Sequence, residues 1–197
     1  MGDKIRTAIE IAMEKVEKLS LSKREKEQIE INKKIEPMLA RFFKRELDPE
    51  SLWKELKEEE KKVFVQFQIK LIETITISLS QEEIKRRKMG VLALEHLKKN
   101  LDAVYVEKIL NSLEVKIVRY QTEKEDYYGQ LKANIENNPK LLLRQINSGG
   151  ENITVRTSVE EAINQSKDWN GFLIEHEKRY TTEISGCLKK IKEELDG

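Results

Sequence analysis

Histidine and cysteine are the residue types that most often bind metals or act as nucleophiles and bases, and this chain has few of them. It contains two histidines, His96 and His176, and one cysteine, Cys187. Three such side chains are too few for a four-ligand zinc site. A di-iron bundle needs two Glu-x-x-His motifs, but Ala93 and Leu173 stand three positions before the histidines. We therefore expect no metal or other cofactor in sites of these kinds.

The sequence also lacks the motifs that bind nucleotides or present a catalytic serine. It has no Gly-x-Gly-x-x-Gly and no Gly-Lys-Ser/Thr to hold phosphates, and no Gly-x-Ser-x-Gly elbow. Cys187 has no histidine near it in sequence, so we interpret it as a small buried hydrophobe. With 36 acidic residues, close carboxylate pairs are inevitable and uninformative. We predict that the protein is not an enzyme, and keep a carboxylate-based metal enzyme in a helical bundle as the second alternative.

The strongest charged cluster of the sequence is a run of four cations, Lys85, Arg86, Arg87 and Lys88. Such a cluster can bind phosphates, so nucleic-acid binding through 85–88 is the first alternative function. However, four consecutive residues of a helix point in different directions around its axis. No aromatic residues alternate with the cations, as a platform for single strands would require. We therefore interpret the cluster as a solvated surface.

The composition favours helices. The chain has 197 residues, of which 37 are Lys or Arg and 36 are Asp or Glu, for a net charge of +1. Intrinsic disorder usually combines few apolar residues with a high net charge, so this balance argues against it. Only eight Gly and three Pro occur, which leaves little turn chemistry for an all-β fold. The excess of Lys and Glu over Arg and Asp is also typical of proteins from hot environments.

The clearest pattern is a series of apolar and tyrosine residues whose spacing alternates between four and three. Its members are Val106, Leu110, Leu113, Ile117, Tyr120, Tyr127 and Leu131, with Lys124 and Asn134 at the two remaining positions. This spacing places them on one face of a helix. A helix over 102–137 would be ~54 Å long, so we expect it to pair with another long helix.

A second long helix is predicted over 159–195, after a capping box that begins at Ser158. Its apolar face consists of Ile163, Trp169, Leu173, His176, Tyr180, Ile184, Cys187 or Leu188, Ile191 and Leu195. Two helices of matching length indicate an antiparallel hairpin over 102–195 with a small tip at 138–157. We interpret both faces as a helix–helix interface. Within it, we expect His176 to meet a facing carboxylate or solvent; a pH-sensitive or partner-contacting role is the alternative.

Residues 1–101 are predicted to form a separate N-terminal helical region. Its helices are expected near 4–35, 37–47, 49–78 and 81–99. Capping boxes begin at Ser22 and Ser80. Pro37 should kink or restart a helix, and Pro49 follows Asp48 as a first helical residue.

Two segments leave alternatives open. Apolar residues alternate over 63–79, which is a strand signal, but no Gly, Pro or Asn interrupts them, so we favour a buried helix. Residues 139–157 fit either a short helix and a loop, or a β-hairpin that turns at Gly149-Gly150.

The sequence therefore predicts an elongated all-α protein with a coiled-coil-like hairpin. We expect a non-catalytic interaction protein, that is, a scaffold, adaptor or assembly factor that associates with itself or with another protein through its seams. Helical arms with small tips can also hold clients, by analogy of architecture. The longest aliphatic run, 91–94, is far short of the ~20 residues of a membrane helix. No apolar signal peptide follows Met1, so a cytoplasmic location is expected.

Overall fold

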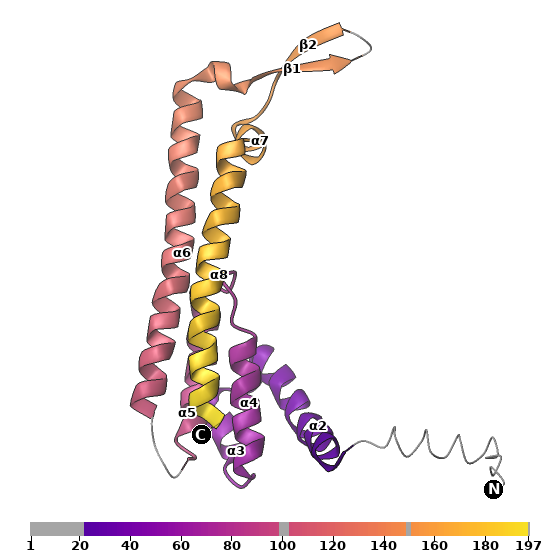
Figure 1. Ribbon diagram of the computed structural model, residues 1–197, viewed down its shortest axis with the longest axis vertical. Coiled ribbons are helices and arrows are strands. Elements are labelled where there is room, and N and C mark those ends of the chain that lie inside the picture. The colour runs from indigo at the N-terminus through magenta and orange to yellow at the C-terminus, as the bar shows by residue number, and fades with distance from the viewer. Residues whose placement is uncertain (1–21, 99–102, 149–150, 197) are drawn as a thin grey trace, which may run out of the picture. The chain divides into compact units, whose positions relative to one another are not determined.

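The computed structural model describes residues 22–98, 103–148 and 151–196. These residues are mainly helical and include one small two-stranded sheet, which confirms the all-α class (Figure 1). The chain forms two compact units, 1–48 and 49–197. The boundary between them thus differs from the division between residues 101 and 102 that the sequence predicts.

The first unit contains helix α2, Lys23–Phe43. It begins at the predicted capping box: the Ser22 hydroxyl accepts a hydrogen bond from the Glu25 amide (3.2 Å), and the Glu25 carboxylate accepts one from the Ser22 amide (2.7 Å). The part of the predicted first helix over 4–21 lies outside the described residues.

Pro37 neither ends nor restarts a helix, contrary to the boundaries predicted at 4–35 and 37–47. It lies inside the continuous helix α2. A proline in a helix interior removes one backbone hydrogen bond, but the apolar stripe of α2 continues on both sides of it, through Ile35 and Leu39. The helix ends instead at Phe43, before Arg45, which has the left-handed φ of 66° that commonly closes a helix.

The second unit opens with α3, Pro49–Leu56, and α4, Lys61–Glu73, where one helix over 49–78 was predicted. The break falls in the charged run 57–60, which offers no apolar side chain to bury. The helix prediction for 63–79 is confirmed as far as Glu73. There the Thr74 hydroxyl donates to the carbonyl of Leu71 (2.7 Å), and β-branched residues follow that fit a helix poorly.

Helix α5, Gln81–Glu95, packs against α3, α4 and the long helix α6, and α4 contacts α8. A buried polar network ties these helices together. The Gln68 amide donates to the Val91 carbonyl (2.8 Å) and the Glu95 carboxylate (3.0 Å), while the Lys98 ammonium contacts Glu95 (3.1 Å) and the Leu195 carbonyl (3.1 Å). Residues 49–98 therefore belong to the same unit as the hairpin, which is why the division falls at 48/49.

The predicted long hairpin is present: α6, Ala103–Asn137, and α8, Lys167–Asp196, lie side by side and antiparallel (Figure 1). The last helix is shorter than the predicted 159–195, because α7, Val159–Asn164, precedes it as a separate element. Ser158 caps α7 in the predicted capping box. Ser166 provides the second start, since its hydroxyl accepts a hydrogen bond from the Trp169 amide (3.0 Å).

The tip that joins α6 to α7 contains both of the alternatives left open by the sequence. A short 3-10 helix, η1 at Pro139–Leu142, leads into strand β1, Leu143–Ser148, which pairs antiparallel with β2, Glu151–Arg156. Gly149 and Gly150, the predicted turn, lie outside the described residues. The tip thus presents a two-stranded sheet at the end of the paired helices (Figure 1).

Candidate functional site

The predicted interface residues lie in the α6–α8 hairpin of one chain. On α6, five are buried: Val106, Leu110, Leu113, Ile117 and Tyr120. On α8, four are buried: His176, Tyr180, Ile184 and Ile191. Tyr127, Leu131 and Leu173, which lie nearer the tip, are half-buried. The seams are therefore occupied within the chain before any partner binds.

Aromatic rings stack along the middle of this seam. Tyr127 stacks on Phe172 with ring centroids 4.2 Å apart, Phe172 on His176 at 4.6 Å, and His176 on Tyr120 at 4.9 Å. Tyr180 meets the His176 ring edge-on at 4.8 Å. Because these rings come from both helices, they fix the register of α6 against α8.

His176 is the polar member of the stack and is only 4% exposed. Its Nε2 lies 3.1 Å from the carbonyl oxygen of Tyr120, which can only accept, so Nε2 carries the proton. Its Nδ1 lies 3.4 Å from a guanidinium nitrogen of Arg179 and 3.6 Å from the Glu123 carboxylate. The expected facing carboxylate is therefore Glu123. With both nitrogens engaged, this imidazole contributes to the packing of the two helices.

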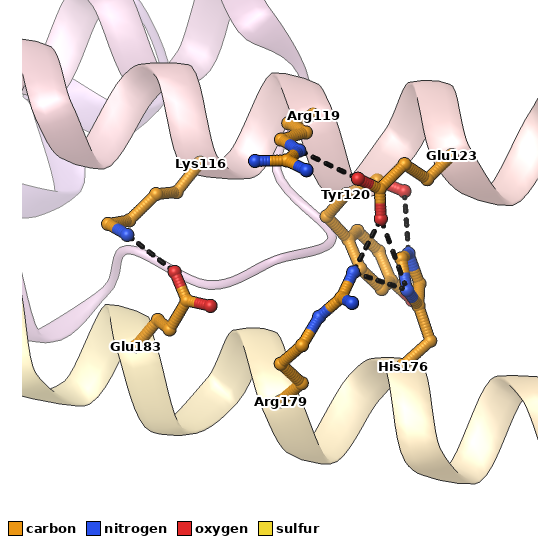
Figure 2. Close-up of polar contacts among 7 residues, drawn as sticks. All are labelled: Lys116, Arg119, Tyr120, Glu123, His176, Arg179 and Glu183. Carbon is orange, nitrogen blue, oxygen red and sulfur yellow. Dashed lines mark hydrogen bonds and ion pairs between the residues drawn. The ribbon is translucent and has the colours of Figure 1, made fainter.

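Glu123 is the centre of a polar cluster that crosses the hairpin, as Figure 2 shows. Its carboxylate accepts from Arg119 of its own helix (2.7 Å) and from Arg179 of α8 (2.5 Å). Partial burial opposes ionisation of Glu123, but hydrogen bonds from Arg119 and Tyr180 outweigh it and lower its pKa. Two turns away, Lys116 pairs with Glu183 of α8 at 2.5 Å.

The Tyr120 hydroxyl makes a further bond between the two helices. It donates to the Glu177 carboxylate at 3.2 Å. Burial, together with the negative charge of Glu177, raises the pKa of Tyr120 to about 12. The hydroxyl thus stays protonated and keeps its donor role at any physiological pH.

A groove of about 810 Å³ opens beside the aromatic stack, between α6, α8 and the turn that follows α4. Its volume lies within the range of small-molecule sites. Tyr128 and Trp169 line it, together with the side chains of Lys124, Glu125 and Glu177. Charges of both signs meet there, so the lining favours no charge class of ligand. Among the described residues, no group of three or more His, Cys, Asp or Glu side chains is arranged to hold a metal ion.

The basic cluster at 85–88 is dispersed around α5. Arg87 donates from Nε to the Thr74 hydroxyl (2.9 Å) and from a terminal nitrogen to the Glu83 carbonyl (3.2 Å), and its burial lowers its pKa. Lys88 pairs with Glu114 of α6 at 2.9 Å. Lys85 is exposed and Arg86 half-buried. Arg87 and Lys88 thus bind residues outside the cluster, and the four cations do not form one stripe.

The tip carries exposed apolar side chains that the sequence reasoning did not single out as a site. Leu141, Leu143, Ile153 and Val155 are each between 38% and 52% exposed. The available signal was the density of apolar residues in a segment too short to build its own core. Exposed apolar side chains that lie close together often mark a binding site, so the tip is the second candidate site. Ile153 and Val155 lie on one face of the sheet, and Leu143, which pairs with Arg156, lies on the other. We name these four residues together the tip patch.

None of the helices in the described part of the chain is both long and apolar enough to cross a membrane. Neither a curated protein nor a solved structure matches the chain. A protein-family profile does match, over residues 50–195, which is nearly the whole of the second compact unit and includes both candidate sites. Since this match covers well over half of the sequence, the chain belongs to DUF6657, a family of unknown function.

Proposed function

We propose that this protein is a non-catalytic interaction protein whose α6–α8 arm presents the tip patch to a protein partner in the cytoplasm. The observation that carries the proposal is the presence of four exposed apolar side chains at the tip, Leu141, Leu143, Ile153 and Val155, of which Ile153 and Val155 share one face of the sheet. A polypeptide partner suits this surface, because it can cover apolar side chains and the free edge of a strand together.

The α6–α8 seam supports the proposal by giving the tip a stiff support. The stacked rings and the ion pairs of Glu123 and Lys116 join the two helices along their middle. A scaffold, adaptor or assembly factor needs this kind of stable spacing between its base and its contact surface.

Self-association through the seams stays a prediction. Because the seam is buried within one chain, only some modes of oligomerisation could use it. Ile117 and Tyr180, for example, already pack inside one chain. An oligomer that used them would have to exchange α6 or α8 between copies, as in domain swapping. A partner at the tip needs no such exchange.

The test is affinity purification from the native cells with quantitative mass spectrometry. The tip variant replaces Leu143, Ile153 and Val155 by serine. Its matched control places serine at three exposed apolar positions of the helices, Val104, Val115 and Ile174.

We expect partners that co-purify with the wild type and with the control variant to be lost from the tip variant. Equal recovery with all three proteins would contradict the proposal. Circular dichroism and thermal melts establish that the variants are folded.

A further inference from the structure

We propose that the outer edge of β2 binds an extended segment of the partner in which apolar and acidic residues alternate. This inference rests on the proposed function and names the kind of partner that the tip accepts. Three features of the tip support it: the hydrogen-bonding pattern of the sheet, the exposure of β2 and the positive charge of residues 138–157.

The register of the sheet identifies the backbone groups that point outward. The amide of Thr157 donates to the carbonyl of Leu142 (2.9 Å), which makes these two residues a hydrogen-bonded pair. Such pairs alternate with non-bonded pairs along an antiparallel ladder. Residues 143/156, 145/154 and 147/152 are therefore the non-bonded pairs. On β2, the backbone N–H and C=O groups of Asn152, Thr154 and Arg156 consequently face away from β1.

This edge of β2 can accept a strand. The sheet of the described residues has two strands, so β2 has one strand neighbour. Every β2 residue from Asn152 to Arg156 is exposed. Two-stranded sheets are marginally stable in water, and a third strand adds both hydrogen bonds and side-chain packing. An incoming strand would satisfy the outward groups of β2 and extend the sheet.

The two faces of β2 differ, and this difference determines the alternation in the ligand. Ile153 and Val155 are two residues apart and share one face, whereas Arg156 lies on the other face opposite Leu143. Side chains of a third strand lie beside those of β2 on each face. Apolar residues at every second position would cover Ile153 and Val155, and acidic residues between them would meet Arg156.

Charge complementarity favours an acidic segment over a second copy of this chain. Residues 138–157 contain three basic residues, Lys140, Arg144 and Arg156, and one acidic residue, Glu151, for a formal charge of +2. Arg144 additionally donates to the Gln165 side chain, which holds it at the tip. Two tips brought edge to edge would each carry this positive charge and repel one another.

The probe is an eight-residue, fluorescein-labelled peptide of alternating aspartate and valine, and its binding to the full chain is followed by fluorescence anisotropy. The decisive pair of variants is Thr154→Pro and Gln145→Pro. These residues face each other in a non-bonded pair, so each proline removes an outward N–H and leaves the β1–β2 ladder intact. Only Thr154 lies on the proposed edge.

We expect the acidic peptide to bind, Thr154→Pro to weaken binding about tenfold, and Gln145→Pro to leave it unchanged. Arg156→Glu should weaken binding about fivefold at low salt, and a valine–lysine peptide should not bind. The inference is overturned if the acidic peptide does not bind, or if both proline variants behave alike. It is also overturned if ultracentrifugation finds a dimer that Thr154→Pro dissociates, because the occupant is then a second copy. The affinity purification with the serine variant of the tip tests the proposed function separately. If that variant loses its partners but the acidic peptide does not bind, the tip remains the binding site and the acidic strand is rejected as its ligand.

Discussion

Truncation of Ile117 to alanine should destabilise the protein strongly, because this side chain is fully buried in the α6–α8 hairpin. Replacing a buried isoleucine by alanine costs about 2–5 kcal/mol, as lost transfer free energy plus a cavity. Val115 lies two positions earlier on the same helix and is 65% exposed. Its truncation should change the free energy of unfolding by about 0.5 kcal/mol or less. Both substitutions place the better helix former in α6, so their difference isolates packing.

Urea unfolding, followed by circular dichroism at 222 nm, measures the difference. With a slope of about 1–3 kcal/mol per molar urea, Ile117→Ala should lower the midpoint by about 0.7 M or more, and Val115→Ala should leave it nearly unchanged. The reasoning is refuted if the two variants unfold at the same urea concentration. It is also refuted if the loss caused by Ile117→Ala shrinks at higher protein concentration, because the seam is then buried between chains.

Three further variants test the capping, the stack and the acid sensitivity of the fold. Ser158→Ala removes the cap of α7 and should lower the free energy of unfolding by about 1 kcal/mol. Hydrogen exchange of the backbone amides over 159–164 should become faster, whereas the control Ser185→Ala, at an exposed position, should leave this exchange unchanged. His176→Phe keeps the ring and should cost less than about 1.5 kcal/mol, but His176→Ala should cost about 3 kcal/mol; equal losses in thermal melts would refute a packing role. The hydrogen bond from Lys192 holds the pKa of Glu73 below its usual value. The ionised Glu73 carboxylate stabilises the fold fully above the pKa that Glu73 has in the unfolded state, and this stabilisation is lost as the pH falls through its lower pKa in the folded state. In the wild type, the urea midpoint should therefore decline below about pH 4.5, and Glu73→Gln should make this decline less steep.

Much of the hairpin could be predicted from the sequence, because burial and helical spacing act together over many turns. The predicted end of α6 agrees with the structure, its predicted first residue lies outside the described residues, and the capping boxes of Ser22, Ser80 and Ser158 are all present. Local signals of this kind depend on neighbouring residues alone. They need no knowledge of the tertiary contacts.

The seam itself departs from the predicted pattern near the tip. Asn134 was expected on the seam, but it is exposed, and the next residue, Ile135, is buried. A strict seven-residue repeat drifts by about 20° per heptad on a straight helix. The four heptads from Val106 to Asn134 accumulate about 80°, which is close to the rotation of one residue. A fixed seven-residue repeat therefore predicts the wrong buried residue near the end of a long straight helix.

The breaks within the predicted helices and the exposure of the tip were not predicted from the sequence. Ser166 caps the start of α8 inside the segment 159–195, which was predicted as one continuous helix. The charged run 57–60 separates α3 from α4 inside the predicted helix 49–78. The exposed state of Ile153 and Val155 could not be read from their apolar type, since apolar residues in a strand usually predict burial. In the described part of the chain, their sheet has two strands and projects beyond the end of the paired helices (Figure 1).

Site-specific photo-crosslinking in the native cells tests the central claim, partner binding at the tip, most directly. A photoreactive amino acid is introduced at Ile153 on the tip, or at exposed Ile174 on α8 as a control. We predict a crosslink to another protein from position 153, none from position 174, and loss of the crosslinked product when Thr154→Pro is added. Crosslinking from position 174 alone, or crosslinks from position 153 only to a second copy of this chain, would contradict it.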